Sequence, residues 1–206
     1  LIARQEQLIT ILRERRSAEI SAATEEVGPL VPLRRIVGRI RQGASPNCEK
    51  VPGDGVTEWA VLKTGCSNSG RFDPTENKRL PDDEAPNPEH AVNSGDIVLS
   101  RSNTGALVGM AAVVKGFYPR LLLSDLNYAI TLHGETDPEF VAYAMRSGQS
   151  RAVLTASAKG TSSSMQKLSQ RDVLNLEIAL PSRDTQHRIV QQLDAKVSAI
   201  DTLIPK

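Results

Sequence analysis

The sequence of 206 residues contains little of what several protein classes require. It has three histidines and only two cysteines, Cys48 and Cys66, which lie far apart, so the spacing of a zinc site and a disulfide framework are both missing. No run approaches the roughly 20 apolar residues of a membrane span, and we expect no signal peptide. These absences predict a cytoplasmic protein that does not bind a membrane. The length predicts one large domain, or one domain with an appendage.

The motifs of common DNA-modifying enzymes are also missing. There is no Asn/Asp-Pro-Pro-aromatic tetrad for methylating adenine, and no glycine-rich loop for S-adenosylmethionine. Residues 159–167 (KGTSSSMQK) lack the Gly-Lys-Ser/Thr ending of a phosphate-binding P-loop. Glu76-Asn77-Lys78 resembles half of a nuclease metal site, but Asp54 and Asp73 are expected on loops with no strand between them and this motif. We therefore expect no catalysis, no metal and no cofactor.

Charge is balanced over the whole chain but uneven along it. Lysine and arginine number 25 and the acids 24, which gives a net charge of +1. Four arginines cluster at Arg34, Arg35, Arg39 and Arg41, whereas residues 73–96 are strongly acidic. A local basic patch is compatible with a nucleic-acid partner but does not require one.

Both ends of the chain have the pattern of amphipathic helices. In residues 182–206 the apolar positions follow steps of three and four, as in the seam of a coiled coil: Val190, Leu193, Val197, Ile200 and Ile204. Residues 1–22 hold a similar line through Leu8, Ile11, Ala18 and Ala22, interrupted by Arg15. If Lys206 is followed on paper by Leu1, the seam continues in phase through Leu1, Gln5, Leu8 and Leu12. Two helices packed on an ordinary core are the alternative.

The region between the ends predicts a mixture of strands and helices. We expect strands at residues 57–62, 96–100, 107–114, 121–124, 128–132 and 174–180. Asp137-Pro138-Glu139 predicts a helix start, because Asp caps, Pro suits the first helical position and Glu favours the positive helix end. Ser169 is expected to cap a short turn and Ser182 to begin the last helix. Residues 72–95 are expected to form a long loop.

The order of these segments resembles one protein family. It runs GDIVLSR, NTGALVG, S-x-L-N-Y-A-I, F-x-x-Y-x-x-R-S, KGTSSSMQKLS, LNLEIALP and a final helix with Q-x-x-I-V-x-x-L-D. This series is similar to the specificity subunit of type I restriction-modification enzymes, and the N-terminal QEQLI and ERR segments match that family's conserved helical region. The resemblance covers essentially the whole chain. Family members carry two target recognition domains, whereas one is visible here, so we expect the C-terminal half of a subunit or a half-subunit that pairs with itself.

The resemblance implies an architecture and partners. Residues 28–181 would form an α+β (α/β) target recognition domain with a mixed β-sheet, which reads one half of a split site in double-stranded DNA. Residues 1–27 and 182–206 would be the distal and proximal halves of conserved spacer helices that form an antiparallel coiled coil. These helices would dock methyltransferase subunits, contact the restriction subunit only indirectly, and allow self-association. A helix of about 25 residues is roughly 37 Å long, close to the roughly 34–36 Å of one DNA turn.

Four loops then become candidates for DNA contact. Arg39, Arg41, Lys63 and Lys159 are expected to anchor phosphates, and Gln42, Asn68, Arg101 and Asn103 suit base edges. The other candidates in these loops are Arg71, Ser162, Ser163 and Lys167. Arg101 and Asn103 have a structural role as the alternative, because GDIVLSR and its following turn recur across the family. Two other functions stay open for the chain, an enzyme with its own methyltransferase or nuclease activity and a coiled-coil scaffold that binds only protein.

Overall fold

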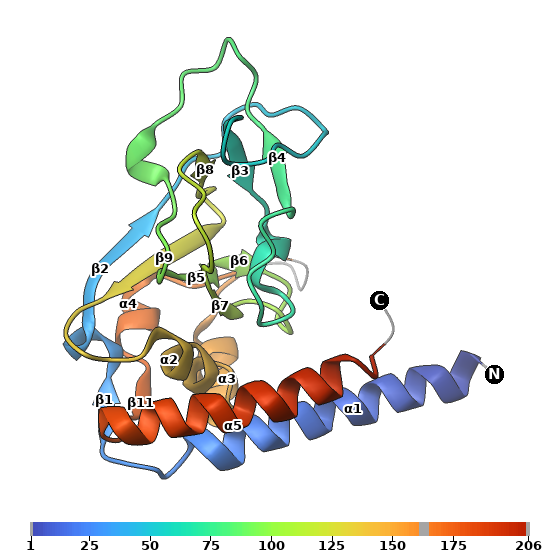
Figure 1. Cartoon of the computed structure of the whole chain (residues 1–206), viewed down its shortest axis with the longest axis vertical. Coiled ribbons are helices and arrows are strands. Elements are labelled where there is room, and N and C mark those ends of the chain that lie inside the picture. The colour runs from blue at the N-terminus through green and yellow to red at the C-terminus, as the bar shows by residue number, and fades with distance from the viewer. Residues whose placement is uncertain (1, 161–164, 205–206) are drawn as a thin grey trace.

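The computed structural model describes residues 2–160 and 165–204, with the two end helices along one edge and a mixed domain above them (Figure 1). Helix α1 (Ile2–Thr24) and helix α5 (Arg183–Asp201) lie side by side. Lys196 Nζ contacts Glu19 Oε2 at 2.7 Å, and Arg16 Nη1 contacts Asp201 Oδ1 at 2.9 Å. Because earlier residues of α1 meet later residues of α5, the two helices run antiparallel.

The first part of α5 is buried against the domain as well as against α1. Its inward residues are Gln186, Ile189, Leu193, Val197 and Ile200. Ile189 lies one position before the expected seam residue Val190, which is half-buried, and Ile204 is also half-buried. The apolar face of α5 therefore packs partly as a helix on a domain core, which is the alternative that the sequence left open.

The inward face of α1 differs from the line drawn through its sequence. Leu12 and Ile20 are buried, but Leu8 and Ile11 are 53% and 51% exposed. The small residues that continue this line, Ala18 and Ala22, are exposed too. An apolar stripe thus runs along the outer face of α1, on the side turned away from α5 and the domain.

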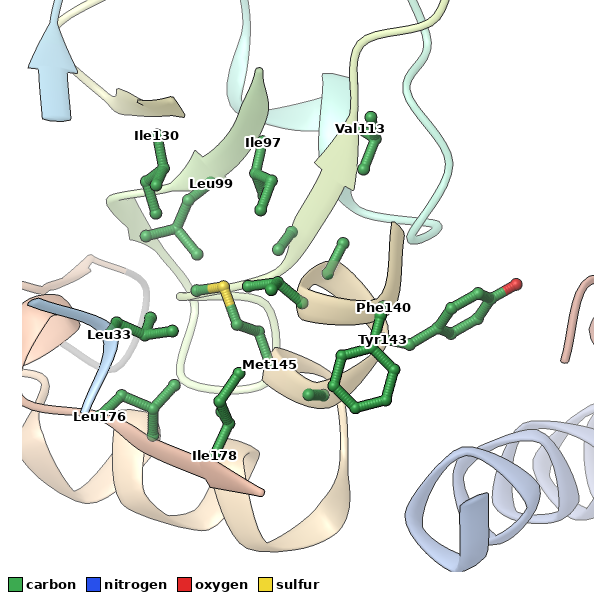
Figure 2. Close-up of a cluster of buried hydrophobic side chains, with 14 of the residues drawn as sticks. Leu33, Ile97, Leu99, Val113, Ile130, Phe140, Tyr143, Met145, Leu176 and Ile178 are labelled. Carbon is green, nitrogen blue, oxygen red and sulfur yellow. The ribbon is translucent and has the colours of Figure 1, made fainter. Parts of the chain in front are cut away.

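A four-stranded antiparallel sheet forms the centre of the domain. Its order is β2 (Val37–Gln42), β9 (Asn127–Leu132), β5 (Ile97–Ser100) and β7 (Ala111–Val113). Helix α2 (Pro138–Met145) covers one face of it. Figure 2 shows the sheet residues Ile97, Leu99 and Ile130 pointing toward Phe140 and Met145 of α2, and all five are fully buried. Burying such side chains stabilises the fold by about 1.5–3 kcal/mol each relative to exposure, so this layer is the main core.

A smaller mixed sheet makes the upper part of the domain in Figure 1. Strand β3 (Ala60–Leu62) pairs antiparallel with β4 (Asn77–Arg79) and parallel with β8 (Leu121–Leu122). Two short pairs complete the strands: β1 (Leu30–Pro32) with β11 (Glu177–Ala179), and β6 (Ser102–Asn103) with β10 (Gln166–Lys167). The remaining elements are η1 (Leu33–Arg35), η2 (Thr64–Ser67), η3 (Pro88–His90), α3 (Gly148–Ser157) and α4 (Gln170–Leu174). The domain is therefore α+β, with antiparallel and mixed sheets.

The helix starts agree with the sequence, whereas several strands are shorter than expected. Asp137 accepts hydrogen bonds from the backbone N–H groups of Glu139 and Phe140, and Ser169 forms a capping box with Asp172. The predictions of strand at residues 57–59 and 107–110 were wrong. Residues 107–110 form a turn, in which Gly109 has φ +79°. No helix in the described parts of the chain is long and apolar enough to cross a bilayer.

Candidate nucleic-acid interface

Arg41 lies in the interior rather than on a basic surface. Its side chain is 9% exposed and forms an ion pair with Asp96, whose side chain is 1% exposed. Arg41 Nη1 also donates to the carbonyl oxygen of Ala91 at 2.6 Å, and Asp96 Oδ1 accepts from Thr131 Oγ1 at 2.7 Å. The guanidinium therefore ties strand β2 to the segments around β5.

Arg39 and Arg71 are exposed, but both face carboxylates. Arg39 Nη2 lies 3.3 Å from Glu89 Oε2. Arg71 Nε contacts Asp201 Oδ2 at 3.1 Å, and its Nη2 donates to Ser198 Oγ at 2.7 Å. Arg71 thus joins the loop before β4 to helix α5, whereas Arg39 pairs with a different segment, the one that carries Glu89.

Gln42 and Arg101 meet at one carbonyl oxygen. Gln42 Nε2 donates to the carbonyl of Asp125 at 3.0 Å, and Arg101 Nη1 donates to the same oxygen at 3.1 Å. Arg101 Nε also donates to the hydroxyl of Tyr128 at 3.0 Å. Next to Gln42, a Cβ on Gly43 would lie 1.7 Å from the carbonyl oxygen of Leu123, so only glycine allows this close approach. These contacts fix two expected base readers against the turn that precedes β9.

Asn68 and Asn103 come from different loops and contact each other. Asn103 Nδ2 donates to Asn68 Oδ1 at 3.1 Å and to Ser100 Oγ at 3.1 Å. Strand β6 carries Asn103 and pairs with β10, which ends at Lys167. Lys159 and Lys167 form a β-bridge, and both side chains are exposed and make no ion pair with a described residue. Ser162 and Ser163 lie outside the described residues.

Lys63, one of the expected phosphate anchors, lines a cavity of 420 Å³. The cavity runs between residues 45–48 on one side and Lys63 and Lys78 on the other, with Ser124 and Leu126 in its lining. Lys63 is half-exposed and lies 3.9 Å from Glu76, whereas Lys78 is exposed and has no ion pair with a described residue. Sequence patterns did not select residues 45–48 for binding, and they singled out Lys78 only as part of a possible metal site. The signal that was present, the Glu76-Asn77-Lys78 motif, belongs to the edge strand β4.

The chemistry of this face is that of hydrogen bonding and charge. Burial raises the pKa of the Cys66 thiol to about 12, and its Sγ accepts a hydrogen bond from Asn127 at 3.8 Å, so this thiol is a core group. Within the described residues, no group of three His, Cys, Asp or Glu side chains could hold a metal ion. Exposed amines and side-chain amides are groups that bind phosphate oxygens and base edges.

Comparison with known proteins finds one similar sequence and several similar folds. No known family profile matches the chain. The type I restriction enzyme EcoEI specificity subunit of Escherichia coli is 27% identical over 172 residues, which are 83% of this chain and 29% of that protein. The chain therefore spans less than a third of its curated relative. The resemblance that the ordered motifs indicated is confirmed.

Solved structures show the same fold. The HsdS subunit of Thermoanaerobacter tengcongensis matches 98% of this chain and 48% of its own, with a TM-score of 0.57 and 15% identity. The type I restriction-modification S subunit of M. genitalium matches 81% of this chain and 38% of its own, with a TM-score of 0.54 and 17% identity. A structure of the type I R-M system matches 98% of this chain and 52% of its own, with a TM-score of 0.59 and 17% identity.

Proposed function

Starting from this resemblance, we propose that the chain is a target recognition domain of a type I restriction-modification specificity subunit. It binds one half of a bipartite site in double-stranded DNA and supplies no catalysis of its own. The observation that carries the proposal is the convergence of three loops, seen in the Asn68–Asn103 contact and the pairing of β6 with β10. One face thereby presents side-chain amides next to exposed lysines, as a DNA-reading surface requires.

We assign the residues of this face to three roles, which are phosphate anchors, base readers and supports. Lys63, Lys78, Lys159 and Lys167 present amines that can neutralise backbone phosphates. Asn68 and Asn103 are the readers, because they lie at the meeting point of the loops. Arg101 and Gln42 act as supports, because both donate to the carbonyl oxygen of Asp125 and so hold the turn that precedes β9.

The end helices supply the second half of the proposal. The outer stripe of α1 carries Leu8 and Ile11, each about half exposed, and an exposed apolar stripe on a helix marks a protein contact. We propose that this stripe joins a longer antiparallel coiled coil with the other half of the subunit or with a second copy, and that the assembled helices dock methyltransferase subunits. The restriction subunit would be contacted only through that assembly.

An electrophoretic mobility assay with the chain and its methyltransferase partner tests the proposal. We expect binding to duplex DNA at low salt that weakens steeply as salt rises, because phosphate contacts release counterions. The protein-only scaffold is the second candidate, since Leu8 and Ile11 alone would serve it. Assembly with the partner but no DNA binding at any salt concentration would select the scaffold and refute DNA recognition.

The matching test for the helices replaces Leu8 and Ile11 with glutamate. Both side chains are on the outer face, so the melting temperature should stay within a few degrees while binding to the methyltransferase subunit falls. Ile20→Glu is the contrasting variant, because Ile20 is 3% exposed and its loss should unfold the helix from the domain. Unchanged assembly by Leu8→Glu/Ile11→Glu would exclude the stripe as the docking surface.

A further inference from the structure

A cluster of arginines lies in the corner where helix α1 meets the domain. A cavity of 180 Å³ is lined there by four arginines and two hydroxyl residues: Arg13, Arg16, Arg146, Arg151, Ser17 and Ser69. Ile20 and Met110 complete the lining, and no carboxylate is part of it. A single water needs only about 10–15 Å³ of such volume, so the cavity has room for a partly hydrated tetrahedral anion.

Two of these arginines are held by backbone carbonyls instead of acids. Arg146 is 8% exposed, and it donates Nε to the carbonyl of Ala142 at 3.1 Å and Nη1 to that of Gly70 at 2.7 Å. Arg151 donates Nη1 to the carbonyl of Val108 at 2.5 Å. Neither forms an ion pair with a carboxylate of the described residues. Their positions are therefore fixed without a direct ion pair, and the Arg146 guanidinium also lies 4.4 Å from the centroid of the Tyr143 ring.

The backbone at residue 70 is shaped around this arrangement. Gly70 has φ +79°, and a Cβ there would lie 1.8 Å from Arg146 Nη1. Any other residue would both strain the backbone and displace the guanidinium. Such a site is preorganised, because its donors are oriented before a ligand arrives.

The electrostatics of the corner favour an anion. Burial lowers the pKa of the Arg146 guanidinium, Tyr143 and Glu139 act in the opposite direction, and the nearby charge of Arg16 lowers the pKa as well. Arginine nevertheless stays protonated in proteins, so the corner carries concentrated positive charge. Two carboxylates act on the corner from outside its lining, because Asp201 pairs with Arg16 at 2.9 Å and Glu139 interacts electrostatically with Arg146. Arg13 is exposed and makes no ion pair with a described residue, which leaves it available to a ligand.

The corner adjoins the face that carries the reading loops. Ser69 follows Asn68 directly, and Asn68 accepts the hydrogen bond of Asn103. Arg16 Nη1 donates to the carbonyl of Ser69 at 3.3 Å, so α1 touches the same loop. Figure 1 shows the helix pair running on past the domain, so α1 and the domain form the two sides of an angle. A duplex lying on the reading loops would bring its backbone to this angle.

We propose that the arginine corner binds a phosphate-class oxyanion, and that its source is one backbone phosphate of the bound DNA. This source rests on the proposed function of DNA recognition, whereas the oxyanion chemistry rests on the corner alone. A phosphate bound there would set the position of the DNA relative to the helices. It would carry no sequence information, because phosphates are alike at every base pair.

Arg13→Gln tests the corner, with Arg15→Gln as the matched control. Both side chains are exposed on α1 and lack ion pairs with described residues, but only Arg13 lines the cavity. The affinity of the 206-residue chain for a fluorescent duplex of arbitrary sequence is measured by anisotropy between about 50 and 200 mM salt. Loss of one phosphate contact lowers the salt slope, the slope of log affinity against log salt concentration, by about 0.9. The fold-decrease in affinity between the lowest and the highest salt should therefore be about 3.5 times smaller for Arg13→Gln than for the unmodified chain. Arg15→Gln should keep the slope of the unmodified chain.

A second pair of variants adds charge instead of removing it. Ser17 lines the corner and Ala18 lies on the outer face, and both are exposed. Ser17→Glu should weaken duplex binding by about tenfold or more, because it places a carboxylate beside the bound phosphate, whereas Ala18→Glu should not. Circular dichroism melting of all four variants verifies that each remains folded.

Inorganic phosphate separates the two sources of the anion. Melting temperatures are compared in phosphate and in chloride of equal ionic strength, since a ligand of the folded state raises the melting temperature. Phosphate should stabilise the unmodified chain and Arg15→Gln more than Arg13→Gln.

If Arg13→Gln and Arg15→Gln have equal salt slopes, but phosphate no longer raises the melting temperature of Arg13→Gln, the corner binds a free anion and the DNA assignment is overturned. Equal behaviour of Arg13→Gln and Arg15→Gln in both assays would overturn the site itself. Absence of duplex binding by the unmodified chain, both alone and with its methyltransferase partner, would refute the proposed function, while the phosphate arm still decides the corner.

Discussion

Replacing Arg41 tests whether this arginine stabilises the fold through its ion pair with Asp96 or binds DNA phosphate. In the sequence Arg41 belongs to a basic cluster that suits phosphate binding, and in the fold its side chain is 9% exposed against a carboxylate that is 1% exposed. Replacing Arg41 with alanine leaves Asp96 buried without its cation. Breaking such a pair costs about 3–5 kcal/mol, because one charge stays desolvated. Asp96 keeps the hydrogen bonds from Thr131 Oγ1 at 2.7 Å and Asn93 N at 2.8 Å, so we expect the lower end, about 3 kcal/mol.

The measurement is the free energy of unfolding from urea denaturation, together with the melting temperature. For a domain of this size about 3 kcal/mol corresponds to a fall in melting temperature of about 6–12 °C. Arg39→Ala is the control in the same strand, because the side chains of its pair with Glu89 are 63% and 77% exposed. Exposed pairs contribute less than about 1 kcal/mol.

A double-mutant cycle makes the test stricter. Asp96→Ala alone should also destabilise the fold, and the combined Arg41→Ala/Asp96→Ala variant should lose less than the sum of the single changes. The reasoning is refuted if Arg41→Ala melts within about 2 °C of Arg39→Ala and yet loses affinity for every DNA sequence alike. Arg41 would then be an exposed phosphate anchor, as its place in the sequence suggested.

Three further predictions concern other parts of the molecule. Lys159→Gln and Lys167→Gln should each lower the salt slope of DNA binding by about 0.9 without changing the melting temperature, which anisotropy titrations and thermal melts measure, and an unchanged slope would remove that lysine from the interface. The pKa of the Cys66 thiol is raised from 9.0 to about 12, so the folded state keeps a proton that the unfolded state loses; the free energy of unfolding should therefore fall as pH rises from 9 toward 12, and Cys66→Ala should make this fall shallower in urea titrations. Leu193→Asp should unfold the domain, because Leu193 is 1% exposed within the main core, whereas Ile200→Asp should free only the end of α5; equal loss of stability in both would contradict this division.

Local signals in the sequence predicted helix starts well, because capping is a short-range effect. Asp137 and Ser169 accept the expected backbone hydrogen bonds, and the last helix begins after Ser182. Strand β4 could not be predicted in this way. Its residues, Asn77–Arg79, have little preference for strands and adopt that form because they pair with β3.

The side of a helix that faces inward also depends on its tertiary neighbours. The apolar residues of α1 allow two lines, one through Leu8 and Ile11 and one through Leu12 and Ile20. The structure buries the second line and leaves the first on the surface. The periodicity alone could not choose, because Arg16 and Glu19 turn inward to meet Asp201 and Lys196.

The candidate site shows the same limit for charged residues. Loop composition indicated which segments carry polar groups, and the fold brings Asn68 and Asn103 together from positions 35 residues apart. It did not indicate which arginines already have partners. Arg41 and Arg71 face acids that lie 55 and 130 residues further along the chain, and such distant pairings leave no trace in local sequence.

The pairing of β1 with β11 bears on how the proposed recognition domain could be exchanged between subunits. Leu30 lies opposite Ala179, so the polypeptide enters and leaves the domain at one place, and the domain behaves as a cassette on a single stem. Grafting at this stem would preserve the helix pair whatever the incoming domain recognises. The β1–β11 pair is not the only attachment of the domain to the helices, however, because Arg71 donates hydrogen bonds to Asp201 and Ser198 of α5. A graft would therefore also need apolar residues that pack on Leu193 and Val197 of α5, together with a cation in place of Arg71, to keep the angle between the domain and the helices.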